Sequence, residues 1–266
     1  MQKKYYFLAG LSRSGSTALG SILSQNPNIY VSGTSGLSTL ALDLNKQYSY
    51  YFGHLKNSNE LQKLNILRSL FEGTYKHIDK TVIFDKGRNW PTNIKLLKEI
   101  FNCDPKFIIT VRNIPDILAS YILIHEKSKS ELLPNRLKEL NLKDNIKNRC
   151  LILWDEYGSQ PWQLLNSVYD NYSDIFHIVE YNDLINDSAK EIKNIYDFFE
   201  LDYYQHDFKN IINNEPEYDD LAYNVKGMHD VHVELKKYSP NAKEVLGDDL
   251  YEYYTNLKLE FWRKPQ

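Results

Sequence analysis

The sequence has few cysteines, no excess of either charge and no long apolar run. Its 266 residues include only two cysteines, Cys103 and Cys150, and neither has a partner at the spacing of a zinc site. Two isolated thiols in a chain of this length are typical of packing residues in a reducing compartment. The 32 Lys and Arg residues against 35 Asp and Glu residues give a net charge of −3. This balance argues against a cationic surface for nucleic acid or anionic lipid.

No segment approaches the roughly 20 apolar residues that a membrane-spanning helix needs. The apolar run at residues 5–11 is too short for a secretory signal peptide, so we expect a soluble, cytoplasmic protein. Strand candidates are spread over residues 5–179 without a linker or an internal repeat. We therefore predict a single domain over residues 1–266 and leave its oligomeric state open.

Four short apolar segments have the composition of buried strands. They are Tyr5–Ala9, Thr81–Phe84, Lys106–Val111 and Ile175–Val179. Their β-branched and aromatic content, without polar alternation, is typical of a parallel sheet that is covered on both faces.

Helical patterns lie between these strands. Residues 37–78 and 143–172 are expected to be largely helical, and Ser188 with Glu191 forms a capping-box pattern before another helix. Strands that alternate with helices predict a doubly wound α/β architecture. Residues 215–240 hold neither period for long, and a loop of this length inside a compact protein is usually functional.

The sharpest local pattern is GLSRSGST at residues 10–17, directly after the first strand. Its spacing is that of the phosphate-binding loop G-x-x-x-x-G-K-[ST], except that Ser16 stands at the lysine position. The glycines allow a tight turn, and the backbone N–H groups and the dipole of the following helix favour a bound anion. Without the lysine, the loop is poorly suited to a triphosphate with its metal ion, whereas Arg13 offers a planar fork for a terminal oxyanion.

Polar and cationic residues also follow the other predicted strands. Asp85, Lys86 and Arg88 follow the second strand, Arg112 follows the third and Tyr181 follows the fourth. In an open α/β sheet, ligands bind outside the carboxyl ends of the strands. These side chains are therefore expected to gather around the glycine-containing loop.

A second anion site is expected at the third strand. Arg112 ends that strand, and Ser120 lies on the helix that follows, so the two side chains could converge on one anion. In the alternative arrangement, Arg112 pairs with Asp116 and Ser120 only packs.

Together these stretches resemble the sulfotransferase family that uses 3′-phosphoadenosine 5′-phosphosulfate (PAPS). Residues 10–17 resemble the signature G-x-P-R-S-G-[ST]-T, with Ser12 in place of the proline. Residues 107–120 resemble a strand followed by R-[DN]-x-x-D and by a serine eight residues after the arginine. With the stretches 85–88 and 181–201, the matches span residues 5–201.

The resemblance implies a fold and a ligand. The fold is three-layered, with a central, mainly parallel sheet like that of P-loop NTPases and with helical insertions. The 5′-phosphosulfate would be held by the Arg13 side chain and by the backbone amides of Ser14, Gly15, Ser16 and Thr17. The 3′-phosphate would be held by Arg112 and Ser120, with Tyr181 against the nucleotide and with Lys226 and Gly227 closing over it.

The implied reaction is in-line transfer of the sulfuryl group to a hydroxyl or an amine, with adenosine 3′,5′-bisphosphate (PAP) leaving and no metal ion required. Lys86 and Arg13 are the candidates for stabilising the negative charge on the equatorial and leaving oxygens. The acceptor is expected to be a small molecule, a glycan or a peptide. Its site would be walled by the helical insertions at residues 37–78 and 123–172.

The proton acceptor stays open at this stage. Some family members have a glutamate in the stretch that corresponds to residues 31–36, but these residues hold no carboxylate here, and Arg88 stands where other members have a histidine. Asp85 is the nearest carboxylate, and His229 and His232 are alternatives.

Two other classes of protein fit parts of the pattern. A P-loop small-molecule kinase would use Asp85 at the end of an apolar strand to hold magnesium, although the loop lacks the lysine of that class. A non-catalytic nucleotide-binding protein would keep the loop and lack the base.

Overall fold

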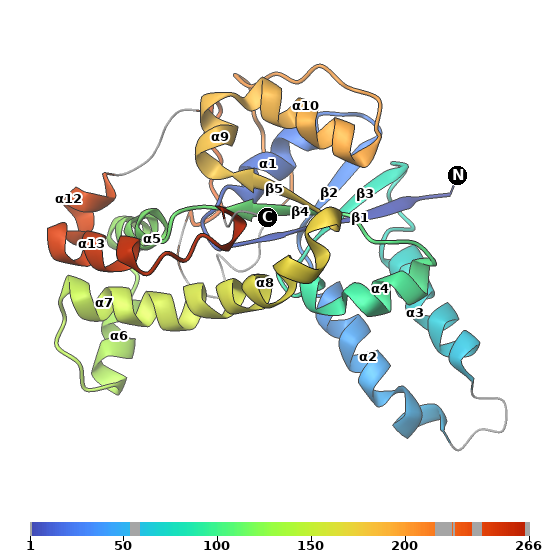
Figure 1. The fold of residues 1–266 in the computed structure, drawn as a ribbon, viewed down its shortest axis with the longest axis horizontal. Coiled ribbons are helices and arrows are strands. Elements are labelled where there is room, and N and C mark those ends of the chain that lie inside the picture. The colour runs from blue at the N-terminus through green and yellow to red at the C-terminus, as the bar shows by residue number, and fades with distance from the viewer. Residues whose placement is uncertain (1, 54–58, 216–224, 226, 236–240, 264–266) are drawn as a thin grey trace.

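A computed structural model describes residues 2–53, 59–215, 225, 227–235 and 241–263. Its centre is a five-stranded parallel sheet with the strand order β2-β3-β1-β4-β5 (Figure 1). The strands are β1 (Lys4–Gly10), β2 (Ile29–Thr34), β3 (Val82–Lys86), β4 (Phe107–Val111) and β5 (Phe176–Glu180). The predicted α/β fold with a mainly parallel sheet is confirmed.

The four predicted strands form within two residues of their expected ends, and the edge strand β2 was not predicted. Strands β3 and β4 are buried along their whole length, which explains their uninterrupted apolar sequence. Strand β2 has only three apolar residues before Ser32 and Gly33, and its register against β3 shifts between Val31 and Thr34. A short, irregular edge strand of this kind leaves little periodic signal.

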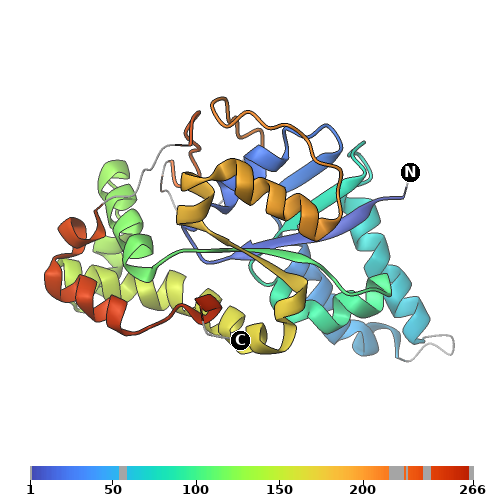
Figure 2. The same ribbon diagram turned by 45° about the horizontal axis from the view of Figure 1, so that its top comes forward.

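Helices cover both faces of the sheet (Figures 1 and 2). One face packs against α1 (Ser16–Leu23), α9 (Tyr181–Asn186) and α10 (Ser188–Phe199). The other packs against α2 (Leu37–Phe52), α3 (Glu60–Thr74), α4 (Ile94–Phe101), α5 (Ile114–Ser128) and α8 (Ser159–Tyr172). Successive residues of β1 supply the two cores, because Phe7 lies in one and Leu8 in the other, both fully buried.

The expected helical segments are confirmed, with breaks that the pattern does not show. Residues 37–78 form the α2–α3 pair, and residues 143–172 form α7 (Ile146–Leu153) and α8, joined by a π-helical turn at Trp154–Gly158. The short 3-10 helices are Trp90–Asn93, Ser173–Ile175 and Phe261–Arg263.

The predicted capping box before α10 is wrong by one residue. The cap is Asp187, whose carboxylate accepts a hydrogen bond of 3.2 Å from the backbone N–H of Lys190. Ser188 is the first helical residue, and its hydroxyl donates to the carbonyl of Leu184 at 2.7 Å. Glu191 pairs with His177 of β5 at 3.1 Å. It therefore ties the helix to the sheet.

Further helices extend the fold beyond one end of the sheet. They are α6 (Leu132–Glu139), α12 (Ala242–Leu246) and α13 (Asp248–Asn256), and α12 and α13 pack on α5 (Figure 1). Of the long loop expected at residues 215–240, residues 215, 225 and 227–235 are described, and they contain no helix or strand. No helix in the described part of the chain combines the length and the apolar character that crossing a bilayer requires.

Candidate functional site

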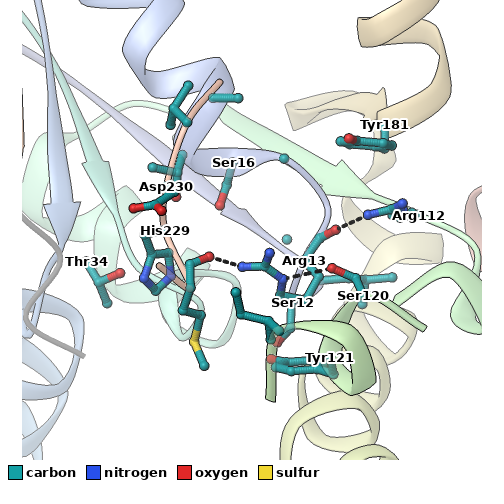
Figure 3. A pocket seen from close by; sticks show the side chains of 18 of the residues that line it. Ser12, Arg13, Ser16, Thr34, Arg112, Ser120, Tyr121, Tyr181, His229 and Asp230 are labelled. Carbon is teal, nitrogen blue, oxygen red and sulfur yellow. Dashed lines mark hydrogen bonds between the residues drawn. The ribbon is translucent and has the colours of Figure 1, made fainter. Parts of the chain in front are cut away.

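A cavity of about 470 Å³ opens at the carboxyl ends of β1, β3 and β4 (Figure 3). Parallel strands place their carboxyl ends at one edge of the sheet, where the residues that follow each strand meet. Nine of the predicted site residues line it: Arg13, Gly15, Ser16, Thr17, Lys86, Arg112, Ser120, Tyr181 and Gly227. Ser14 and Asp85 are placed elsewhere, as described below, and Lys226 lies outside the described residues.

The loop between β1 and α1 is held in one conformation by hydrogen bonds that Ser14 makes inside the protein. The Ser14 hydroxyl donates to the carbonyl of Leu11 at 2.5 Å and lies 2.7 Å from the hydroxyl of Thr110 on β4, so this side chain points into the protein. Gly15 caps α1 with a left-handed φ of 90°, and a Cβ atom there would lie 2.9 Å from the Tyr181 ring. The first N–H groups of α1, from Ser16 onward, have no partner within the helix and can bind an anion.

Lys86 brings an ammonium group to the same end of the cavity. Its Nζ donates to the Thr17 hydroxyl at 3.0 Å, and only 9% of the residue's surface is exposed. Its backbone is fixed as well: the N–H donates to the Ser32 hydroxyl at 2.9 Å, and the carbonyl accepts from the Ser35 N–H at 2.7 Å. The irregular end of β2 therefore determines where this cation lies.

Arg112 and Tyr181 form the opposite side of the loop. The guanidinium carbon of Arg112 lies 4.0 Å from the centre of the Tyr181 ring, and Nη1 donates to the carbonyl of Arg13 at 3.1 Å. Burial lowers the pKa of Arg112, but a guanidinium keeps its charge in a protein. Burial also raises the pKa of Asp116, and the positive charge of Arg112 opposes that rise.

Arg13 reaches further than the sequence suggested. Its Nε donates to the Ser120 hydroxyl at 3.2 Å, and Nη1 donates to the backbone carbonyl of Met228 (Figure 3). Arg13 and Ser120 were expected to serve different anions, and the structure instead joins them. The left-handed backbone of Arg13, with a φ of 57°, accompanies this placement. One side chain thus connects the loop, α5 and the segment after Gly227.

Asp85 is buried beneath the site and does not reach the cavity. Its carboxylate has no exposed surface and accepts hydrogen bonds from Trp90 Nε1 at 2.6 Å and from the Tyr75 hydroxyl. Burial raises the pKa of this carboxyl, against the lowering effect of its hydrogen bonds. This corrects the expectation of a catalytic carboxylate: successive strand residues face opposite sides, so a cavity-facing Lys86 turns Asp85 inward.

We therefore expect Asp85 to stabilise the fold through its buried hydrogen bonds and to take no part in catalysis. We expect Asp85→Asn to keep turnover within about threefold, whereas Asp85→Ala, which leaves two buried donors unpaired, should destabilise the protein by about 2–4 kcal/mol.

The buried carboxyl of Asp85 should also make stability depend on pH. Because its folded-state pKa lies above the ordinary 3.8, the folded state binds the proton more tightly than the unfolded state does. Asp85 should therefore lower the free energy of unfolding as the pH rises above about 4. Asparagine should remove this slope, as measured by urea unfolding at several pH values.

Several cavity residues carried no clear signal in the sequence. Thr34 ends the unpredicted strand β2, and Tyr121 lies on the helix after Ser120. Asp230 and Glu234 line the cavity from the long segment, together with the two suspected histidines, His229 and His232. Since that segment has no regular period, only its packing shows which of its side chains face the site.

The chain matches a known protein family over most of its length. The profile described as the sulfotransferase family matches residues 6–205. Among curated proteins, no sequence matches.

Solved structures of low sequence identity share the fold. Mouse sulfotransferase SULT7A1 complexed with PAP is 16% identical, with a TM-score of 0.57 over 100% of this chain and 87% of the other. The sulfotransferase domain from the curacin biosynthetic pathway is 13% identical, with a TM-score of 0.54 over 97% of both chains. Retinol dehydratase in complex with androsterone and the inactive cofactor PAP is 12% identical, with a TM-score of 0.54 over 100% of this chain and 82% of the other.

Proposed function

Because this chain belongs to the sulfotransferase family, we propose that it transfers the sulfuryl group of PAPS to a hydroxyl or amine group of an acceptor. The observation that carries the proposal is that one cavity is lined by two sets of groups whose chemistry suits an anion. The first comprises the amino end of α1 and Lys86, and the second comprises Arg112 and Ser120. A nucleotide with a phosphosulfate at one end and a 3′-phosphate at the other needs two such sets.

The positions of the two sets suggest the orientation in which PAPS would bind. The phosphosulfate would lie at the N–H groups of residues 15–17, where Lys86 is already held. The 3′-phosphate would lie near Arg112 and Ser120, with the Tyr181 ring as a flat surface for the nucleotide. SULT7A1 and retinol dehydratase contain PAP in their structures, which supports a nucleotide of this kind for the shared fold.

The chemical step would require little covalent work from the protein. The acceptor oxygen forms a bond to sulfur while the bond from sulfur to the 5′-phosphate oxygen breaks, and PAP leaves with the electron pair. Lys86 would stabilise the charge that develops on the leaving oxygen, and the N–H groups of the loop would hold the equatorial oxygens. Arg13 would neutralise charge between the two ends of the nucleotide, since it lies beside Ser120.

The acceptor would enter beside Thr34, Arg88 and His229, which line the cavity. We propose a small molecule, a glycan or a peptide for this role. The rival kinase reaction is less well supported, because the aspartate that would hold magnesium is buried against Trp90 and Tyr75.

Removing the guanidinium of Arg112 should weaken PAP binding. We expect Arg112→Ala to cost about 1.5–3 kcal/mol, which is about a 10- to 150-fold rise in the Kd for PAP, because charged hydrogen bonds to the 3′-phosphate disappear. Isothermal titration of PAP, without metal, against the wild type and the variant measures this change. Arg112→Lys keeps the charge and should lose less, since a lysine cannot both fork to the phosphate and stack on Tyr181.

Two controls accompany this titration. Arg149→Ala removes a guanidinium that pairs with Asp144 on the surface, at 2.7 Å, and should leave PAP affinity unchanged. ATP with magnesium is titrated in parallel, and a preference for it over PAP would favour the kinase. A protein that binds PAP but transfers no label from PAPS to phenols, sugars, peptides or water would be a nucleotide-binding protein without this activity.

A further inference from the structure

The described cavity offers few groups that can take a proton from the acceptor. Asp85 is buried away from it, and Thr34, which has no carboxylate or imidazole, occupies the end of β2. Among the described lining residues, the carboxylates and imidazoles are those of His229, Asp230, His232 and Glu234. All four come from one short segment, residues 227–235, which none of the motifs at the strand ends includes.

A tight turn at residues 227–230 holds this segment against the site. Gly227 has a left-handed φ of 78°, and the Asp230 N–H donates to its carbonyl at 3.3 Å. The side chains of Val225, which precedes the turn, and Met228, which lies within it, are buried in the core. A Cβ atom at Gly227 would lie 2.7 Å from the Asp230 carboxylate, so the turn closes tightly on itself.

The turn is also tied to the phosphate-binding loop. Arg13 donates from its guanidinium to the carbonyl of Met228, the residue directly before His229 (Figure 3). This bond places His229 one residue from the contact, whereas Glu234 lies six residues beyond it. In Figure 3 the imidazole of His229 lies toward Thr34, on the other side of Arg13 from Ser120. His229 is half-buried, while Asp230 and His232 are exposed.

We propose that His229 is the general base that activates the acceptor. The assignment rests on the proposed sulfuryl transfer. An imidazole nitrogen of His229 takes the proton of the acceptor hydroxyl as its oxygen bonds to sulfur, and the bond from sulfur to the 5′-phosphate oxygen breaks. The proton then passes from the half-buried ring to water. By donating to the carbonyl of Met228, Arg13 fixes the position of this base relative to the loop that would hold the sulfuryl group.

His229→Ala tests the assignment. A positioned general base contributes about 100-fold or more to the rate, so kcat for transfer from radiolabelled PAPS to 2-naphthol, a sugar or a serine peptide should fall by about that factor. The Kd for PAP should stay within about twofold of the wild type, because no step of PAP binding uses the imidazole. Added imidazole should restore part of the activity of His229→Ala, a result that a purely structural role does not produce.

His77→Ala is the control, because this histidine is exposed and does not line the cavity. It should keep transfer within about threefold of the wild type and gain nothing from imidazole. Full activity in His229→Ala, or lost activity without imidazole rescue, overturns the assignment and leaves the sulfotransferase proposal standing. A wild-type protein that fails to bind PAP or to transfer label overturns both.

Discussion

Replacing Lys86 with methionine should slow sulfuryl transfer by about 100- to 1,000-fold, the loss typical of removing one preorganised group that stabilises developing charge. The effect should fall mainly on kcat, because the charge on the leaving oxygen is largest in the transition state. The Lys86 ammonium is held by Thr17 at 3.0 Å and its backbone by Ser32 and Ser35, so it needs little rearrangement to act. Steady-state release of PAP from PAPS measures the change.

Methionine keeps most of the volume of the lysine side chain, and a thermal melt shows whether the variant is folded. Lys95→Met is the matched control, because Lys95 is exposed on α4 and does not line the cavity. It should behave as the wild type does. Unchanged kcat in Lys86→Met would show that the amino end of α1 and the arginines carry the charge without this lysine.

Gly10→Ala should prevent the protein from folding stably. Gly10 has a φ of 150°, and a Cβ atom there would lie 2.3 Å from both the carbonyl oxygen and the hydroxyl of Thr110 on β4. Strain at such a backbone position and overpacking against a central strand together cost on the order of 3 kcal/mol or more. This is a large part of the roughly 5–15 kcal/mol by which folded proteins are stable. Urea unfolding, or loss of soluble expression, reports the effect.

Gly36→Ala provides the comparison within the same chain. Gly36 has a φ of −82°, and a Cβ atom there would meet nothing within 4 Å. Its replacement should change the free energy of unfolding by less than about 1 kcal/mol. A Gly10→Ala variant as stable as Gly36→Ala would mean that β1 and β4 separate more easily than their hydrogen bonds suggest.

Local pattern predicted the three central strands and the edge strand β5, and missed the other edge strand, β2. β3 and β4 are buried on both faces, so each is a continuous apolar run in the sequence. β2 lies at the sheet edge with Ser32 and Gly33 inside it, and its pairing with β3 is irregular. The position of Lys86 depends on that irregularity, because Ser32 and Ser35 hold its backbone.

The long segment shows a different limit of sequence reasoning. Its lack of periodicity and its length indicated a functional loop, but gave no way to choose among its ionisable residues. The choice comes from Met228, whose carbonyl is bound by an arginine 215 residues earlier in the chain. A contact of this sequence separation leaves no mark in local spacing.

The sequence by itself determined the parallel α/β fold, the glycine-containing loop at residues 10–17 and the cations that follow the strands, because short-range rules govern each of them. Glycine allows tight turns, apolar runs form central strands, and parallel strands end at one edge. The tertiary structure alone decided that Asp85 faces the core, that Arg13 joins Ser120 to Met228, and that His229 reaches the cavity. These outcomes depend on side-chain direction and on packing between distant segments, which no local pattern encodes.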